Sequence, residues 1–360
     1  MIRQLASPNS VIEPCTNLLN DPALTNAQRA EALLIRGRGF HRTKRLEQAA
    51  ADYQAAAALA PDNVEIWMFW ANIEVRRRDG RSYMEKVHRA AGIDPNNPRV
   101  LRAIGVMFEN FGDRDKAMAL YGKALAADPR EPFALLFRSK IYQSERRYAD
   151  AIADADALVA LPRDAINRDG GYLDEEGDVR DFHAIALIHR GRLFQETRQN
   201  DRATQDFDAA IAEEHSAPAL AAKAEFLLSQ SDVSPEAIAL LQEAAMREPG
   251  NASAQLSLGM AYTRSQQFEL ALAAFDKAIA AKPDFASALM MRARMHRQFG
   301  RTDEAVADFI AAVEANPWAL TESMVALRHA GYWTSAKDPD RLTPDLVDAI
   351  RACMIDTMCN

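Results

Sequence analysis

Small and apolar residues recur along this chain at a spacing that predicts pairs of short helices. Prolines recur at one constant interval in two series, Pro61, Pro95 and Pro129, then Pro249, Pro283 and Pro317. Proline cannot continue the interior of a helix, so each is expected to end one helix and open a turn. Each interval leaves room for two short helices and their turns, so we expect a series of helix pairs.

Numbering each interval so that this proline is position 32 shows what the intervals share. Position 20 reads Ala49, Tyr83, Ala117, Ala151, Ala203, Ala237, Ala271 and Ala305, and position 27 reads Ala56, Ala90, Ala124, Leu158, Ala210, Ala244, Ala278 and Ala312. Position 8 is mostly glycine or alanine, and position 24 is aromatic in five of eight intervals. Small residues at positions 8 and 20 let two antiparallel helices approach closely, and the aromatic rings fill the space beside them.

These residues at these spacings resemble the tetratricopeptide repeat family, most clearly in LRAIGVMFENFGDRDKAMALYGKALAADP and LSLGMAYTRSQQFELALAAFDKAIAAKP. The resemblance implies an all-α fold, a right-handed superhelical solenoid of about eight helix-turn-helix units. A single helix pair cannot bury its own apolar face, so stacking of neighbouring pairs forms the core. The units begin near residues 30, 64, 98, 132, 184, 218, 252 and 286.

The register of the repeats predicts five segments. They are an N-terminal capping helix (1–29), repeats 1–4 (30–163), an insert (164–183), repeats 5–8 (184–317) and a C-terminal helical hairpin (318–360). Position 32 falls at Arg163 in repeat four and at His215 in repeat five, a longer interval than elsewhere, so an insert separates these two repeats. Tyr172, Leu173 and Val179 flank a turn-like Asp-Glu-Glu-Gly there, so the insert is expected to be a loop or a small hairpin.

Both ends of the sequence carry cysteines. Cys15 is expected on the buried side of the N-terminal helix. Cys353 and Cys359 are too far apart to bridge on one continuous helix, but a break after Ile355 would allow a disulfide and would indicate an oxidising compartment. The segment MVALRHAGYWTSAKDPDRLTPDLVDAIRAC is also faintly similar to peptidoglycan-binding domains, although a capping hairpin explains it equally.

Charge narrows the choice of partners. The chain holds 43 Lys+Arg against 51 Asp+Glu, a net charge of −8. Nucleic acids and anionic membranes bind basic surfaces, so neither is an expected partner. Residues 1–129 nevertheless hold 18 Lys+Arg against 15 Asp+Glu, a net of +3. An acidic partner is therefore expected towards the N-terminal half.

Enzyme motifs are missing from the sequence. The seven histidines show no HExxH spacing, and neither a phosphate-binding glycine loop nor a Gly-x-Ser-x-Gly elbow occurs. We therefore expect a non-catalytic protein with no cofactor and no metal. No apolar run long enough to span a bilayer and no secretory leader is present, which favours the cytoplasm, or the periplasm if a leader has been removed.

The resemblance also implies where a partner binds, because the first helix of each pair lines the concave groove through positions 2, 5, 9, 12 and 13. These positions carry Arg38, His41, Arg42, Asn72, Arg76, Arg99, Arg102 and Lys140 in repeats 1–4, and Met260, Met290 and Arg294 in repeats 7 and 8. Arginine suits bidentate binding of carboxylates, so the expected ligand is an extended acidic segment or the C-terminus of another protein. The chaperone-binding clamp of some family members is not supported, because Met68 stands where its first cation belongs.

Three alternatives remain open at this point. The arginines could pair with acids of their own repeats, such as Glu65 and Glu109. The methionines could support the C-terminal hairpin instead of a partner. The protein could also belong to the cell envelope, with a C-terminal segment that contacts peptidoglycan while its repeats recruit other factors.

Overall fold

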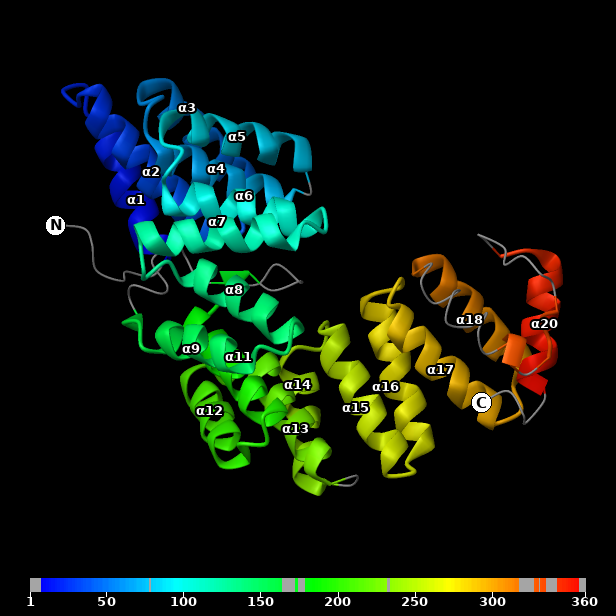
Figure 1. The fold of residues 1–360 in the computed structure, drawn as a ribbon. Coiled ribbons are helices and arrows are strands. Elements are labelled where there is room, and N and C mark those ends of the chain that lie inside the picture. Colours follow the sequence, from blue (N-terminus) through cyan, green and yellow to red (C-terminus); the bar gives the residue numbers. More distant parts are fainter. Residues whose placement is uncertain are drawn as a thin grey trace. The chain divides into compact units, whose positions relative to one another are not determined.

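The structure is a computed structural model, and nearly all of its described residues form helices or the turns between them (Figure 1). It describes residues 8–77, 79–163, 172–173, 179–231, 234–316, 327–329, 331–334 and 342–355. The expected all-α array of helix pairs is confirmed. The chain forms two compact units, Met1–Asp206 and Phe207–Asn360.

The first unit begins with a capping helix, α1, followed by four helix pairs and the first helix of a fifth. Its elements are α1 (Pro8–Leu19), α2 (Asn26–Arg42), α3 (Leu46–Leu59), α4 (Val64–Arg76), α5 (Gly80–Ile93), α6 (Pro98–Asn110), α7 (Arg114–Ala127), α8 (Pro132–Ser144), α9 (Tyr148–Val159), β1 (Tyr172–Leu173), β2 (Val179–Arg180) and α11 (Phe182–Glu196). Strands β1 and β2 pair antiparallel, so the described part of the 164–183 segment is a small hairpin.

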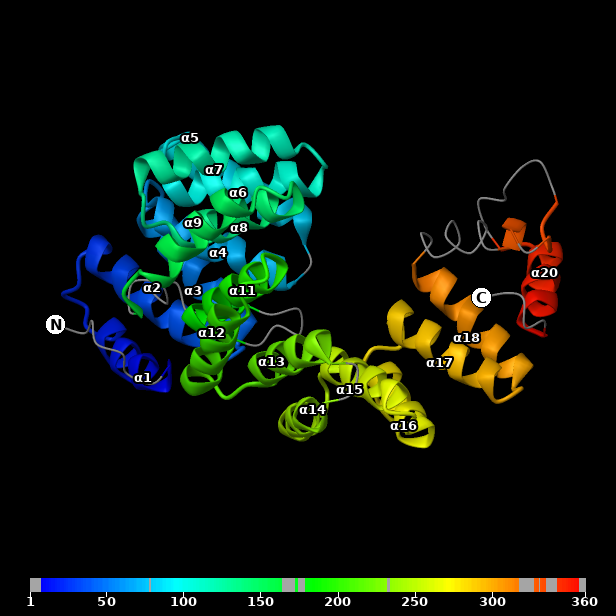
Figure 2. The same cartoon turned by 60° about the horizontal axis from the view of Figure 1, so that its bottom comes forward.

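The described part of the second unit holds three further helix pairs and a terminal helix. Its elements are α13 (Ala217–Gln230), α14 (Pro235–Arg247), α15 (Ala252–Arg264), α16 (Phe268–Ala281), α17 (Ala286–Gln298), α18 (Thr302–Ala315) and α20 (Pro344–Ile355). Helices α17 and α18 lie side by side as one such pair (Figure 2). The division between the units falls within α12 (Asn200–Glu213).

The division between the two units lies within repeat five and not at the insert. Repeat four and the first helix of repeat five belong to the same unit, and their side chains pack directly. The ring of Phe133 on α8 stacks on Phe182 of α11, with 4.4 Å between centroids. The hairpin of the insert therefore does not interrupt the contact between α8 and α11.

Local chemistry explains where the helices begin and end. Asn63 and Asn97 cap α4 and α6, each accepting a hydrogen bond from a backbone N–H of the first turn. Each residue before a repeat proline leaves the helix, and Ala60, Asp94 and Asp128 have φ between −138° and −141°. Proline disfavours the helical conformation of its preceding residue, so the second helix of each pair ends there.

The recurrent small residues form the contact between paired helices. Every alanine at positions 20 and 27 is 0% exposed. A Cβ atom added at Gly37, Gly105 or Gly259 would lie 2.4–2.7 Å from the ring of Tyr53, Tyr121 or Phe275, respectively. Position 8 is therefore glycine in these repeats because the aromatic ring at position 24 occupies the space of a side chain.

The C-terminal segment packs on the last repeat. Leu346 and Ile350 of α20 are buried against Val306 and Phe309 of α18. Cys353, in the same cluster, is disulfide-bonded, whereas Cys15 is a buried free thiol. Cys359 and much of the expected hairpin 318–360 lie outside the described residues.

Candidate partner-binding surface

The candidate surface is the side of α2, α4, α6 and α8 that carries positions 2, 5, 9, 12 and 13, here called the first-helix surface. At its centre Glu65 of α4 lies between two predicted binding residues, 4.0 Å from Arg38 and 3.7 Å from Arg99. Both guanidinium groups also lie over the ring of Phe69, at 4.7 and 5.7 Å from its centroid. One acid and one ring of repeat two therefore hold a cation of repeat one and a cation of repeat three in place.

Arg102 on α6 is held in a similar way by the next repeat. Its Nε lies 3.1 Å from Glu131, and its guanidinium lies 4.9 Å from the centroid of the Phe133 ring. Glu131 is the N-cap of α8 and also accepts a hydrogen bond from the backbone N–H of Ala134 at 2.5 Å. Arg102 is thus part of the contact between repeats three and four, as well as of the first-helix surface.

Arg42, His41 and Arg76 form a second cationic group at the C-terminal ends of α2 and α4. Part of the Arg42 side chain is exposed, but the protein atoms around its guanidinium bury it enough to lower its pKa. The charge of Arg38 adds to this shift. Burial and the nearby charge of Arg76 lower the pKa of His41 to about 4. His41 is therefore neutral at pH 7, and the positive charge of this group comes from the arginines.

Of the remaining two predicted residues of the first-helix surface, Lys140 lies on α8 and Asn72 on α4. Part of the Lys140 side chain is exposed, but burial of its ammonium group lowers its pKa. The charge of Glu109 opposes this shift, and the charge of Arg192 adds to it. Glu109 accepts a hydrogen bond from the Tyr121 hydroxyl at 2.7 Å. Asn72 is partly buried on α4. The expected pairing of arginines with Glu65 is thus observed, whereas Glu109 hydrogen-bonds to a tyrosine.

The predicted residues of the second unit fall into two environments. Met290 packs against the buried cluster that contains Leu346 and Ile350 of α20, so it supports the terminal segment. Met260 is 38% exposed on α15, and Arg294 is exposed on α17. The protein therefore uses one of these methionines in its own packing and leaves the other at the surface.

Four arginines at position 7 form ion pairs with aspartates at position 23 of the same repeat. These ion pairs were not predicted from the sequence. The pairs are Arg36–Asp52, Arg138–Asp154, Arg190–Asp206 and Arg292–Asp308. In each pair Nε and Nη2 donate to the two carboxylate oxygens at 2.6–2.8 Å. Their signal in the sequence was the same arginine-to-aspartate spacing, repeated four times.

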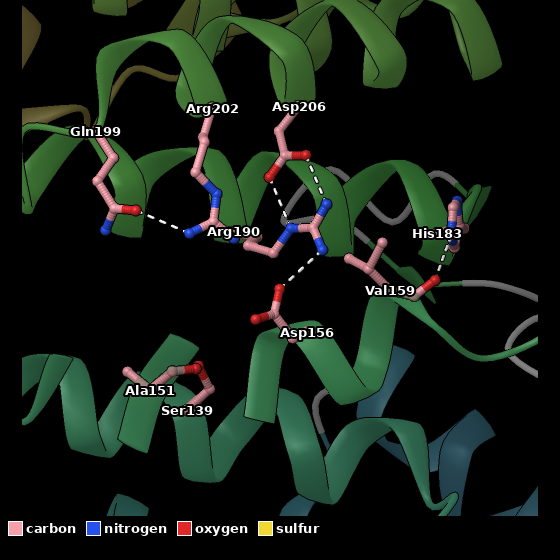
Figure 3. A network of polar contacts seen from close by, with 9 residues as sticks. All are labelled: Ser139, Ala151, Asp156, Val159, His183, Arg190, Gln199, Arg202 and Asp206. Carbon is pink, nitrogen blue, oxygen red and sulfur yellow. Dashed lines mark hydrogen bonds and ion pairs between the residues drawn. The ribbon is translucent and has the colours of Figure 1, made fainter. Parts of the chain in front are cut away.

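Two of these arginines also bind an acid of the preceding repeat. Arg190 donates from Nη1 to Asp156 at 2.9 Å and so lies between two carboxylates (Figure 3). Arg292 donates from Nη1 to Asp276 at 2.6 Å. These side chains join the two helices of a repeat to the previous repeat, so their role is structural.

A buried Ser–His pair, Ser139 and His189, lies between α8 and α11. The Ser139 hydroxyl donates to the carbonyl of Ala151 at 2.7 Å, and Nε2 of His189 lies 2.7 Å from the same oxygen. Because the hydroxyl proton is already engaged, the imidazole donates to the serine and does not act as its base. Burial, then the charges of Lys140 and Arg192, lower the pKa of His189 to about 3.

Among the described residues, no cluster of three or more histidine, cysteine or acidic side chains has the arrangement of a metal site. None of the helices in the described part of the protein has both the length and the apolar composition needed to cross a bilayer.

Comparison with known proteins agrees with this architecture. The tetratricopeptide repeat profile matches residues 21–64, 227–284 and 256–318, and a second profile of the same name matches residues 100–133. The chain is 24% identical over 182 residues to anaphase-promoting complex subunit 3 of Schizosaccharomyces pombe, which covers 50% of this chain and 24% of that protein. The match thus spans about a quarter of this curated relative.

Solved structures share the fold at low sequence identity. A protein of the APC/C hetero-tetramer Cut9–Hcn1 superposes with a TM-score of 0.60 at 13% identity, covering 87% of this chain and 57% of that one. Yeast Tom70 superposes with a TM-score of 0.56 at 15% identity, covering 87% and 67%. The matched segments, the stacked helix pairs and the recurrent side chains together support a tetratricopeptide repeat family for this chain.

Proposed function

We propose that this protein is a non-catalytic scaffold whose first-helix surface binds an extended acidic segment of another protein. The observation that carries the proposal is the group of Arg42 and Arg76 around the neutral His41, with Arg38 close to Arg42, in a protein whose net charge is −8. Burial and then the charge of Arg38 lower the pKa of Arg42, and an anion placed between the arginines would oppose this shift. The exposed Val75 on α4 offers an apolar contact next to Arg76.

The relatives support the scaffold part of this proposal. One is named as a subunit of the anaphase-promoting complex, and another belongs to a hetero-tetramer of that complex. Both names describe proteins that act within assemblies. The acidic specificity is proposed from the arginine group of this protein alone.

The test uses a fluorescein-labelled, C-terminally amidated peptide in which Asp and Glu alternate with Leu and Phe, and a matched peptide with Asn and Gln. Fluorescence anisotropy should show binding of the acidic peptide and at least tenfold weaker binding of the amide peptide. The variant Arg42→Glu/Arg76→Glu should reduce the affinity for the acidic peptide at least tenfold. Arg102 is left unchanged because its loss would also leave Glu131, the N-cap of α8, without its cation.

A matched control separates the site from the overall charge. Arg114 and Lys123 are exposed on α7, the second helix of repeat three. The variant Arg114→Glu/Lys123→Glu changes the net charge by the same amount and should retain the affinity. Equal losses in both double variants would contradict a site on the first-helix surface.

The disulfide at Cys353 supports a second candidate, a cell-envelope protein whose C-terminal segment contacts peptidoglycan. Disulfides persist mainly in oxidising compartments. Thiol labelling and mass spectrometry of the protein from its native host should then show Cys353 blocked until a reductant is added. A Cys353 that reacts without reductant would contradict this candidate.

A further inference from the structure

Tyr53 on α3 carries a buried hydroxyl whose hydrogen bond the protein does not supply. The residue is 0% exposed, and among the described residues no group accepts a hydrogen bond from its hydroxyl oxygen. Its ring is fixed in place, because it occupies the space beside Gly37 and stacks on Phe69 at 6.1 Å. Burying a hydroxyl without a partner lowers the free energy of unfolding, so the position calls for an explanation.

The third repeat contains the same tyrosine with a partner. Tyr121 has the repeat position of Tyr53, and its hydroxyl donates to Glu109, at position 12 of α6, at 2.7 Å. Position 12 of the first repeat is His41. The carboxylate that repeat three provides is therefore replaced in repeat one by an imidazole, which leaves the tyrosine without its acceptor.

The two acids near Tyr53 do not supply the missing acceptor. Arg38 and Glu65 act on its hydroxyl, as does Asp52. Asp52 already accepts two hydrogen bonds from Arg36, and Glu65 lies between Arg38 and Arg99. Both neighbouring carboxylates thus already have cationic partners.

We propose that Tyr53, with Arg38, Arg42 and Arg76, forms a subsite for the side-chain carboxylate of an Asp or Glu in the partner segment. This carboxylate takes the place that Glu109 has in repeat three: it accepts the hydrogen bond of Tyr53 and neutralises the arginines of α2 and α4. The proposal rests on the proposed function and deepens it, because it names the group that is recognised and a donor outside positions 2, 5, 9, 12 and 13.

The experiment compares Tyr53→Phe with Tyr121→Phe, which remove the same atom from equivalent positions. Tyr53→Phe should bind the amidated acidic peptide about tenfold more weakly while its urea midpoint is unchanged or higher, since it removes an unsatisfied group. Tyr121→Phe should keep the affinity and lower the urea midpoint, because Glu109 loses its donor. Equal affinity of Tyr53→Phe and wild type would overturn the subsite.

A second variant tests the same subsite by filling it. His41→Glu places at position 12 the acid that repeat three has, so it should satisfy Tyr53 within the protein and abolish binding without lowering the urea midpoint. Full binding by a folded His41→Glu would also overturn the subsite.

Two further results locate any failure. If Tyr53→Phe binds normally while Arg42→Glu/Arg76→Glu does not, the subsite is wrong and the proposed function stands. If the wild type binds neither the acidic nor the amide peptide, both the subsite and the proposed function are wrong.

A peptide with Asn and Gln side chains and a free C-terminus provides the last comparison. Binding of that peptide in preference to the amidated acidic one would show that a terminal carboxylate, and no side chain, is the group recognised, which overturns the subsite.

Discussion

Two glycines of repeat three predict opposite effects of adding one methyl group. A Cβ at Gly105 would lie 2.5 Å from the ring of Tyr121, whereas a Cβ at Gly122 on α7 would meet nothing within 4 Å. Gly105→Ala should therefore destabilise the protein by about 1–3 kcal/mol through overpacking. Gly122→Ala should stabilise it by about 0.5–1 kcal/mol, because alanine favours the helix. Urea unfolding followed by circular dichroism measures both, and a stabilised Gly105→Ala would contradict the tight contact.

His189 predicts how stability depends on pH. Its pKa is about 3 in the folded protein and about 6.5 when exposed in the unfolded chain. Between these values the unfolded state binds more protons, so the contribution of His189 is complete above pH 6.5 and is lost as the pH falls towards 3. At pH 5 the loss is about 2 kcal/mol.

The measurement is the difference in urea midpoint between pH 7.5 and pH 5. His189→Gln should reduce this difference, because an amide can still donate to Ser139 and does not take up a proton. His88→Gln is the control at an exposed histidine and should leave the difference as it is in the wild type. An unchanged difference in His189→Gln would show that other groups cause the acid sensitivity.

At the scale of the helix pair, positions 7 and 23 hold an ion pair in some repeats and two apolar residues in another. Repeat four has the ion pair Arg138–Asp154, and repeat seven has Leu258 and Ala274 at the same positions. Asp154 is nearly buried, so Arg138→Leu alone leaves an unpaired carboxylate and should cost about 3 kcal/mol.

The double variant Arg138→Leu/Asp154→Ala reproduces the residues of repeat seven. It should recover most of the stability that Arg138→Leu loses, because no buried charge is left without a partner. Urea unfolding of the wild type, both single variants and the double variant completes the cycle. A double variant as unstable as the sum of the two single variants would contradict this account.

The helix pairs were predictable because their signals are local and repeated. Proline at position 32 and alanine at positions 20 and 27 act within one pair, and each occurs often enough to be seen in a single sequence. The ion pairs of position 7 were not predicted although their spacing is regular, because position 7 is not among the positions that face a partner. Their second acids, such as Asp156 for Arg190, depend on how successive repeats stack, which spacing within a repeat does not give.

The contacts within the candidate site were less predictable, because they too depend on how helices of different repeats stack. The sequence places Arg38 and Arg99 at the surface, but it does not show that both share Glu65. It likewise does not show that Tyr53 lacks an acceptor while Tyr121 has one. Both facts depend on distances between different helices.

At the scale of the whole molecule, the uneven charge of the chain means that an acidic partner is attracted at short range and repelled at longer range. Residues 1–129 carry a net +3, which leaves −11 for the remainder of a total of −8. An acidic segment is thus attracted by the arginines that it contacts and repelled by acids spread over the rest of the protein. At about 0.1 M salt the Debye length is roughly 10 Å, so the remote repulsion is already weak.

Salt should therefore weaken binding chiefly by screening the contact arginines. Raising sodium chloride from about 100 to about 400 mM should lower the affinity for the acidic peptide several-fold in the wild type. It should have a much smaller effect in Arg42→Glu/Arg76→Glu, which lacks two of those arginines, and the full effect in Arg114→Glu/Lys123→Glu. Anisotropy titrations at four salt concentrations measure the slopes. Affinity that rises with salt in the wild type would mean that net repulsion outweighs the arginine group, and the first-helix surface would then not be a site for acidic partners.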